Sequence, residues 1–128
     1  MGGQYSAPRK ESKHLDAYVN DLPSMQGKVC AITGTTTGLG FHAARSVLAK
    51  QGDVILLNRP SERADSALKR LQSDAGDAKR VKQVPCDLQS FASVRAAAKA
   101  VNELVGSSGL DVLANNAGSP RKFSCAIL

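Results

Sequence analysis

A glycine-rich segment lies between a short apolar run and an amphipathic stretch, and it constrains the fold more than any other feature of the chain. Its sequence is Thr33-Gly34-Thr35-Thr36-Thr37-Gly38-Leu39-Gly40. The apolar run at 29–32 predicts a buried strand, and residues 39–51 have the pattern of a helix. Gly34 permits a tight turn, Gly38 lets backbone approach a phosphate group, and Gly40 allows the helix to pack closely on the strand. Because the first turn of a helix has free N–H groups and a favourable dipole, the segment predicts a phosphate-binding turn.

The spacing of these glycines distinguishes the turn from two other phosphate-binding motifs. They are arranged as Gly-x-x-x-Gly-x-Gly, which differs from the Gly-x-Gly-x-x-Gly of many dinucleotide-binding folds. A Walker loop carries Lys after its last glycine, whereas this chain has Phe41 there. The position between strand and helix therefore favours a dinucleotide pyrophosphate as the ligand.

Short apolar runs and amphipathic stretches alternate along the chain as far as residue 114. Further strands are predicted at 54–57, 81–84 and 110–114, and further helices at about 61–73 and from the expected N-cap Ser90 to the glycines at 106–109. The apolar stripe of the first of these helices comprises Ala64, Ala67, Leu68 and Leu71, and that of the second comprises Phe91, Val94, Ala98, Val101 and Val105.

Alternating strands and helices require a parallel sheet with right-handed crossovers. The predicted fold class is therefore α/β with a parallel sheet. That the sheet is a Rossmann-like, partial doubly wound one with strand order 3-2-1-4, truncated after the fourth strand, is what the family resemblance given below implies. In that order the first two helices cover one face, and only the third covers the other. The fourth strand, with Val112 and Leu113, is expected to be an exposed apolar edge, which predicts a marginally stable monomer that aggregates or needs a partner.

The chain is expected to have three parts. Residues 1–26 are polar and are expected to form a flexible or loosely docked N-terminal extension, and residues 27–118 the folded half-domain. Residues 119–128 are expected to be a C-terminal tail outside the family, as the resemblance given below implies. The extension has no apolar h-region, and its acidic residues disfavour a mitochondrial transit peptide, so the expected location is cytoplasmic. No segment approaches the roughly 20 apolar residues of a membrane-spanning helix.

The first six residues match the Met-Gly-x-x-x-Ser/Thr pattern for N-myristoylation. A single myristoyl chain binds membranes weakly, so Arg9, Lys10 and Lys13 would have to supply the second signal for membrane association through acylated Gly2. So short a pattern also matches by chance, and both interpretations stay open.

The net charge of +6 arises from 17 Lys and Arg against 11 Asp and Glu, with the two signs interleaved between Arg59 and Asp74 as on a solvated helix face. Because the chain has no Trp and no basic run with stacking aromatics, no nucleic-acid partner is expected. The cysteines Cys30, Cys86 and Cys125 lack the spacing of a disulfide framework or a zinc site. Cys30 is expected to behave as a small buried apolar residue.

Three motifs in register resemble those of the short-chain dehydrogenase/reductase family. Residues 33–40 are similar to its Thr-Gly-x-x-x-Gly-x-Gly motif, Cys86-Asp87-Leu88 to the segment after its third strand, and Asn115-Asn116-Ala117-Gly118 to its Asn-Asn-Ala-Gly motif. The resemblance covers residues 28–118 and excludes the tail. In the residues in and around these motifs, the chain looks most like the retinol dehydrogenase and protochlorophyllide reductase branch of the family.

The resemblance implies a dinucleotide-binding role for residues that match the family's motifs. Thr35, Thr36, Thr37 and Leu39 would contact the phosphates and ribose, Asp87 the adenine amino group, Leu88 the adenine neighbourhood, and Asn116, Ala117 and Gly118 the adenine-side ribose. Gly34, Gly38 and Gly40 would shape the turn. Asn115 would mainly hold the loop.

The end of the second strand selects between the two nicotinamide cofactors. A carboxylate there binds the ribose 2′-OH of NAD, whereas an Arg accommodates the 2′-phosphate of NADP. This chain has Asn58-Arg59 and no acidic residue at that point, so NADP(H) is favoured over NAD(H). The alternative is that Arg59 only ends a strand in solvent.

Catalysis in this family, as the resemblance implies, depends on a Tyr-x-x-x-Lys pair downstream of Asn-Asn-Ala-Gly. Both tyrosines, Tyr5 and Tyr18, precede the glycine-rich turn, and Arg9 and Leu22 stand four residues after them. No catalytic residue is therefore assigned. His14, His42, Ser124 and Cys125 lie in no catalytic motif, and Asp111 is expected to end a loop rather than to act as a base.

Two functions follow. The chain is expected to be the NADP(H)-binding part of an oxidoreductase that acts on a carbonyl or alcohol, without catalytic activity of its own. Alternatively it is a non-catalytic dinucleotide-binding or interaction module that associates with a full-length relative. The substrate pocket would be built largely by later loops of the family, so the substrate stays open.

Overall fold

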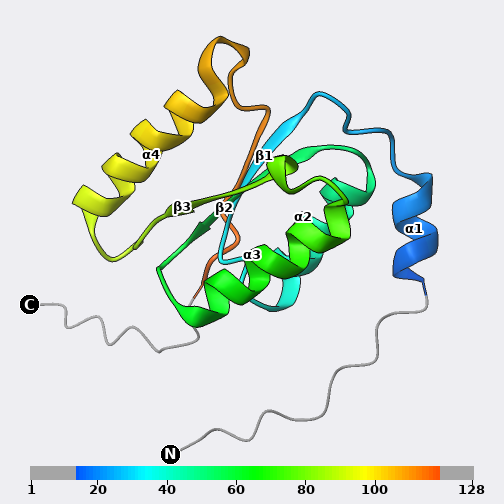
Figure 1. The fold of residues 1–128 in the computed structure, drawn as a ribbon, viewed down its shortest axis with the longest axis horizontal. Helices are drawn as coiled ribbons and strands as arrows, with labels where there is room; N and C mark the ends of the chain where they lie inside the picture. The colour runs from blue at the N-terminus through cyan, green and yellow to red at the C-terminus, as the bar shows by residue number, and fades with distance from the viewer. Residues whose placement is uncertain (1–13, 119–128) are drawn as a thin grey trace, which may run out of the picture.

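A computed structural model describes residues 14–118 of the chain (Figure 1). The helices are α1 (Leu15–Asp21), α2 (Gly38–Ala49), α3 (Glu62–Ala75) and α4 (Phe91–Val105), with short 3-10 turns η1 (Ala78–Arg80) and η2 (Gly106–Ser108). The strands are β1 (Val29–Thr33), β2 (Asp53–Asn58), β3 (Val81–Pro85) and β4 (Val112–Ala114). From β1 onward, the predicted alternation of strand and helix is confirmed.

The strands form one parallel sheet in the order β3-β2-β1-β4, which confirms the predicted fold class. In the register, Ala31 of β1 is the partner of Ile55 in β2 and of Leu113 in β4. Because all strands are parallel, their carboxyl ends lie at one edge of the sheet. The glycine-rich turn, Arg59, Asp87 and Asn116 all follow strands at that edge.

Helices cover the two faces of the sheet unequally. Helices α2 and α3 pack on one face through Phe41, Leu48 and Leu71, around the buried strand residues Ile32 and Leu56. Helix α4 packs alone on the other face, through Ala97 and Val101 against Ala31, Ile55 and Val84, and lies on the side away from α2 and α3 (Figure 1). The predicted distribution of helices is therefore confirmed.

The apolar stripe of α4 differs from the predicted one at two positions. Phe91 is 83% exposed and Ala98 is exposed, whereas Ala97 is buried beside Val101. Ser90 caps the helix as expected, its Oγ accepting a hydrogen bond of 3.3 Å from the Ser93 amide. The capped start places Phe91 at the first helical position, on the outer side of the first turn, so the sheet-facing stripe runs through Val94, Ala97 and Val101 instead.

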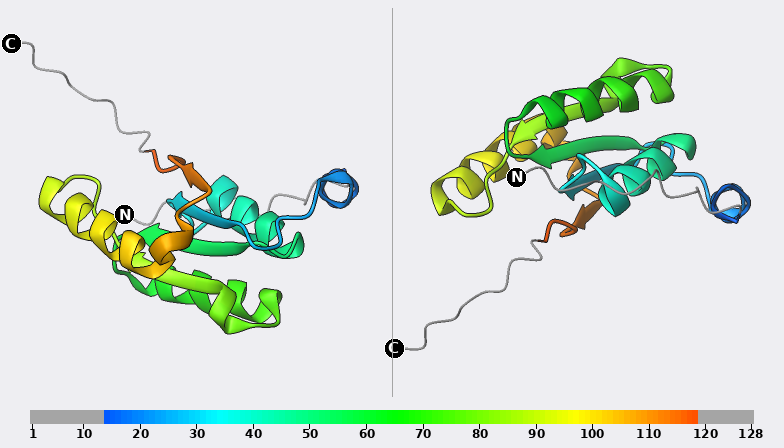
Figure 2. Two further views of the ribbon diagram at one scale, coloured as in Figure 1. Left: turned by 90° about the horizontal axis from the view of Figure 1, so that it is seen from above. Right: turned by 90° about the horizontal axis from the view of Figure 1, so that it is seen from below.

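Part of the N-terminal extension forms a helix that the sequence did not predict. Helix α1 lies at the opposite end of the molecule from α4 in both views of Figure 2, and it buries Val19. Two hydrogen bonds of 2.7 Å join this region to the end of α2: Lys50 Nζ donates to the Asn20 carbonyl, and the Met25 amide donates to the Lys50 carbonyl. Met25 also packs against the core. A single buried apolar residue gives no hydrophobic periodicity, so such a short helix could not be predicted from the sequence.

Other predictions about the termini lie outside the described residues. These are acylation at Gly2 and the tail at residues 119–128. Among residues 14–118, no helix has the length and apolar character that a membrane crossing requires.

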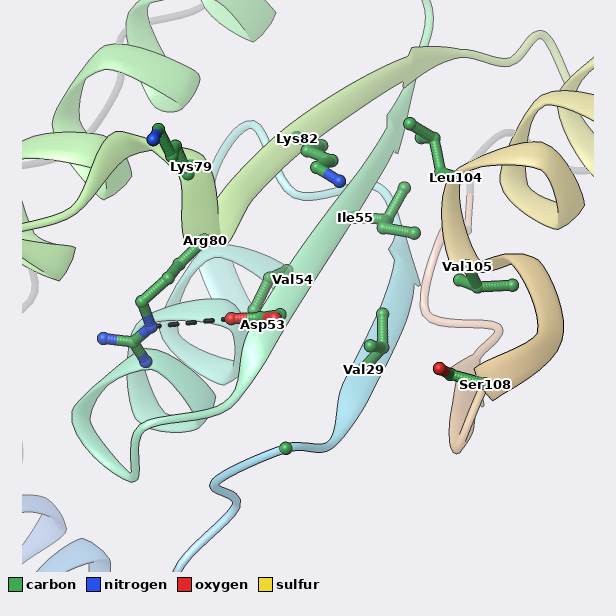
Figure 3. A pocket seen from close by; sticks show the side chains of 11 residues that line it. Val29, Asp53, Val54, Ile55, Lys79, Arg80, Lys82, Leu104, Val105 and Ser108 are labelled. Carbon is green, nitrogen blue, oxygen red and sulfur yellow. Dashed lines mark ion pairs between the residues drawn. The ribbon is translucent and has the colours of Figure 1, made fainter.

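Arg80, the last residue before β3, joins the end of α2 to the start of β2. Its guanidinium donates hydrogen bonds to the carbonyls of Leu48 (2.9 Å) and Gly52 (2.7 Å), and lies 3.6 Å from Asp53 (Figure 3). A hollow of about 240 Å³ lies beside it, lined by Val29, Ile55, Lys82, Leu104 and Val105 among others. This hollow lies at the edge of the sheet opposite the glycine-rich turn.

Candidate functional site

The glycine-rich turn is built around a close approach of its backbone to the segment after β4. Gly34 has a φ of +70°, and its amide donates a hydrogen bond of 3.1 Å to the Leu57 carbonyl at the end of β2. A Cβ on Gly34 would lie 2.9 Å from Ala117 Cα. The absence of a side chain therefore serves the predicted tight turn and also brings Ala117 against it.

Gly40 serves a related purpose in the first turn of α2. A Cβ at this position would collide with the Gly34 carbonyl oxygen and would lie 2.5 Å from Asn116 Nδ2. From the sequence, Gly40 is expected to bring the helix close to the strand. In the structure it brings the helix against the turn that follows β1.

The start of α2 is open to a ligand. The N-cap Thr37 makes no side-chain capping bond, and the first turn carries no acidic residue. Gly38 has a φ of +66°, and nothing lies within 4 Å of where its Cβ would be. Thr37 and Leu39 are exposed, and Thr36 is half-buried. The amides of the first helical turn therefore face open space with neither a capping oxygen nor a carboxylate beside them.

Thr35 differs from its two threonine neighbours because its side chain is fully buried. Its amide donates a hydrogen bond of 2.8 Å to Asn58 Oδ1, and Asn58 Nδ2 donates one of 2.8 Å to Thr35 Oγ1. From the sequence, Thr35 is expected to contact the ligand, and Asn58 has no assigned role. The signal for this pair is a polar residue, Asn58, directly after a run of four apolar residues at 54–57.

The residue that holds the turn from the side of β4 is Asn116, not Asn115. Asn116 Nδ2 donates hydrogen bonds to the carbonyls of Thr33 (3.0 Å) and Gly34 (3.1 Å). The Ala117 amide donates one of 2.9 Å to Thr33 Oγ1. The prediction that Asn115 holds the loop is wrong, because the direction of the chain after β4 points the next side chain at the turn. Asn115 and Gly118 are exposed.

The remaining predicted residues follow β2 and β3 at the same edge. Arg59 comes directly after β2, is exposed, and forms no hydrogen bond or ion pair with another described residue. Asp87 is half-buried; its Oδ1 accepts a hydrogen bond from the Gln89 amide (3.0 Å), and its own amide donates to Ser93 Oγ (2.9 Å). Leu88 is exposed beside it. The second oxygen of the Asp87 carboxylate accepts no hydrogen bond from the described residues.

Two other titratable residues, Asp111 and Cys30, lie away from this edge, whereas Cys86 lies next to Asp87 at it. Asp111 accepts hydrogen bonds from the Val29 amide and from Lys28 Nζ, and these two contacts hold the pKa of its carboxyl below the ordinary value, which confirms that Asp111 is a structural residue. Cys30 is buried as predicted. Burial raises the pKa of the Cys30 and Cys86 thiols, and the nearby charges of Asp111 and Asp87 respectively add to this. High-pKa thiols in apolar surroundings are poor nucleophiles.

The chain is similar to known proteins both in sequence and in fold. It is 39% identical over 101 residues to the short chain dehydrogenase/reductase dpchH of Colletotrichum higginsianum, a match that covers 77% of this chain and 25% of that protein. The solved structures that match its fold include L-sorbose reductase of Gluconobacter frateurii in complex with NADPH and L-sorbose (TM-score 0.65, 30% identity, 75% of this chain and 35% of that one). They also include the N-domain with NADP of a bacterial malonyl-CoA reductase (TM-score 0.69, 35% identity, 76% of this chain and 18% of that one).

The chain thus spans about a third or less of the length of these relatives. The sequence model of the short chain dehydrogenase family matches residues 28–126, which include the whole sheet and the turn described above. The chain therefore belongs to the short-chain dehydrogenase family, and it comprises the family's nucleotide-binding Rossmann portion.

Proposed function

We propose that this chain is the NADP(H)-binding part of a short-chain dehydrogenase/reductase that acts on a carbonyl or alcohol substrate. One arrangement carries the proposal: the uncapped start of α2 and the exposed Arg59 lie at the same edge of the sheet, after the adjacent strands β1 and β2. The first would receive the pyrophosphate, and the second the 2′-phosphate.

The residues at this edge fit the cofactor. The amides of Thr37, Gly38 and Leu39 would donate to the phosphates, because Thr37 makes no side-chain capping bond and the first turn of α2 contains no acidic residue. The Arg59 guanidinium, without an ion-pair partner among the described residues, matches the bidentate geometry of a phosphate. Asp87, Leu88 and Ala117 would lie around the adenine and its ribose. NADP(H), when bound, supplies or accepts a hydride at the substrate carbon.

Proton transfer to or from the substrate oxygen is not assigned to any residue of this chain, since the sequence contains no Tyr-x-x-x-Lys pair. We assign to the chain the binding and orientation of the cofactor. Several solved structures to which it is similar contain NADP or NADPH, which supports NADP over NAD. Acylation of Gly2 and membership of the retinol dehydrogenase branch stay predictions.

Titration of the purified chain with NADPH and NADH, followed by cofactor fluorescence or calorimetry, tests the proposal. NADPH should bind about tenfold or more tightly than NADH, because a charge-assisted phosphate contact contributes on the order of 1.5–3 kcal/mol. Arg59→Asp should reverse this order by repelling the 2′-phosphate and offering a carboxylate to a 2′-OH. Equal affinities of the wild-type chain for both cofactors would refute the role of Arg59.

A further inference from the structure

A reciprocal pair of hydrogen bonds joins the end of β2 to the glycine-rich turn. Asn58, the last residue of β2, is 4% exposed, and the side chain of Thr35 is fully buried. The Asn58 amide group accepts from the Thr35 amide and donates to Thr35 Oγ1, both at 2.8 Å. Each group is thus satisfied by the other, and the two residues are separated by 23 positions in the sequence.

Asn58 also reaches the third strand through its backbone. Its carbonyl oxygen accepts a hydrogen bond of 2.9 Å from the Cys86 amide, just before Asp87. Leu57, the preceding residue, accepts from the Gly34 amide at 3.1 Å. The end of β2 therefore fixes two consecutive amides of the turn, those of Gly34 and Thr35, and ties them to the end of β3.

This arrangement determines which polar group β2 presents to solvent. The Asn58 side chain points into the protein and its hydrogen-bonding groups are engaged by Thr35, whereas Arg59, the next residue, is exposed. A ribose at this edge would meet Arg59 and not the Asn58 amide group. The two adjacent residues divide these roles because β2 ends at the buried Asn58 and Arg59 lies just beyond the strand.

We infer that Asn58 is a positioning residue for the cofactor: through Thr35 it holds the backbone whose amides receive the pyrophosphate, and it leaves selection of the 2′-phosphate to Arg59. The inference rests on the proposed function. Because NADPH and NADH share the pyrophosphate, the Asn58–Thr35 pair acts on both cofactors alike. Arg59 acts on NADPH alone.

Substitutions at Thr35 and Asn58 test the pair with matched controls. Thr35→Val removes the hydroxyl with little change of shape, and Thr35→Ser retains it. Asn58→Leu removes both side-chain bonds. The dissociation constants for NADPH and NADH are measured for these variants, for Thr35→Val/Asn58→Leu together, and for Arg59→Ala, with a thermal melt of each variant.

Thr35→Val and Asn58→Leu should each weaken the binding of NADPH and of NADH by a similar factor, about tenfold, because each substitution leaves a buried polar partner without its hydrogen bond. The double variant should lose much less than the product of the two single losses, because one interaction is removed twice. Thr35→Ser should bind as the wild type does. Arg59→Ala should weaken the binding of NADPH and leave the binding of NADH unchanged.

Three results would each overturn the inference. The loss of cofactor affinity in the double variant could equal the product of the losses in the two single variants, the loss could be confined to one cofactor, or the dissociation constants could be unchanged. A wild-type chain that binds neither cofactor would refute the proposed function instead. Amide hydrogen exchange then decides the role of the pair: loss of protection at Thr35 in Asn58→Leu, with protection retained in Thr35→Ser, supports loop positioning. Unchanged exchange at Thr35 refutes it.

Discussion

The carboxylate of Asp111 accepts a hydrogen bond of 2.9 Å from the backbone amide of Val29, which lies 82 residues earlier in the chain. Its other oxygen accepts one of 3.0 Å from Lys28 Nζ, and the Asp111 amide donates to the Val29 carbonyl at 3.1 Å. One residue thus joins the start of β1 to the start of β4. This matters because β4 pairs with the sheet over only three residues, Val112–Ala114.

Asp111→Asn should lower the melting temperature at pH 7, because the amide keeps an acceptor for Val29 but loses the charge that Lys28 meets. The pKa of Asp111 is lowered in the folded chain, so its stabilisation is complete above the ordinary aspartate pKa and is lost as the pH falls below about 4. Melts from pH 7 to pH 3 should show the difference between wild type and variant shrinking. A difference that stays constant to pH 3 would contradict this, and Asp74→Asn, at an exposed ion pair with Arg45, is the control with little effect.

Arg80→Met should destabilise the chain by about 2 kcal/mol, because the carbonyls of Leu48 and Gly52 lose a charged donor while the apolar stem is kept. The Arg80 side chain is only 23% exposed, so water replaces these bonds poorly. Urea unfolding measures the free energy. Lys79→Met, at the adjacent exposed position, should change it by less than about 0.5 kcal/mol. Equal effects of the two substitutions would show that the Arg80 contacts contribute nothing specific.

Gly40→Ala should cost about 1–3 kcal/mol, because its Cβ would collide with the Gly34 carbonyl and displace Asn116 Nδ2. The displaced turn should also bind NADPH more weakly. Gly118→Ala is the matched control for stability, since nothing lies within 4 Å of its added Cβ. If Gly40→Ala unfolds at the same urea concentration as the wild type, the close contact between α2 and the turn is not required.

The outer edge of β4 should cause self-association. Val112 and Leu113 are 42% and 55% exposed, as the sequence predicted for an edge strand without a further neighbour. Light scattering at tens of micromolar should show species larger than the monomer for the wild type and a shift toward monomer for Leu113→Lys. Leu104→Lys, on α4 at 41% exposure, should leave the distribution unchanged. A monomeric wild type that melts reversibly would contradict the predicted need for a partner.

The order of strands and helices could be predicted because it depends on local patterns. Predicted strands of four or five residues separated by amphipathic stretches admit few parallel-sheet topologies, and the Rossmann arrangement implied by the family resemblance gave the order β3-β2-β1-β4. Individual side-chain directions were less predictable. The apolar stripe predicted for α4 included Phe91, but the position of Phe91 in the first turn leaves its side chain exposed.

The sequence by itself determined the fold class, the glycine-rich turn and the position of Arg59 after the second strand, because glycine spacing and hydrophobic periodicity are properties of consecutive residues. Tertiary structure decided which polar side chains hold that turn. Asn58 meets Thr35, and Asn116 rather than Asn115 meets Thr33 and Gly34, only through the register of β2 and β4 against β1. Partners 23 and more than 80 residues apart leave no local signal, since their hydrogen bonds form only when the strands that carry them are paired.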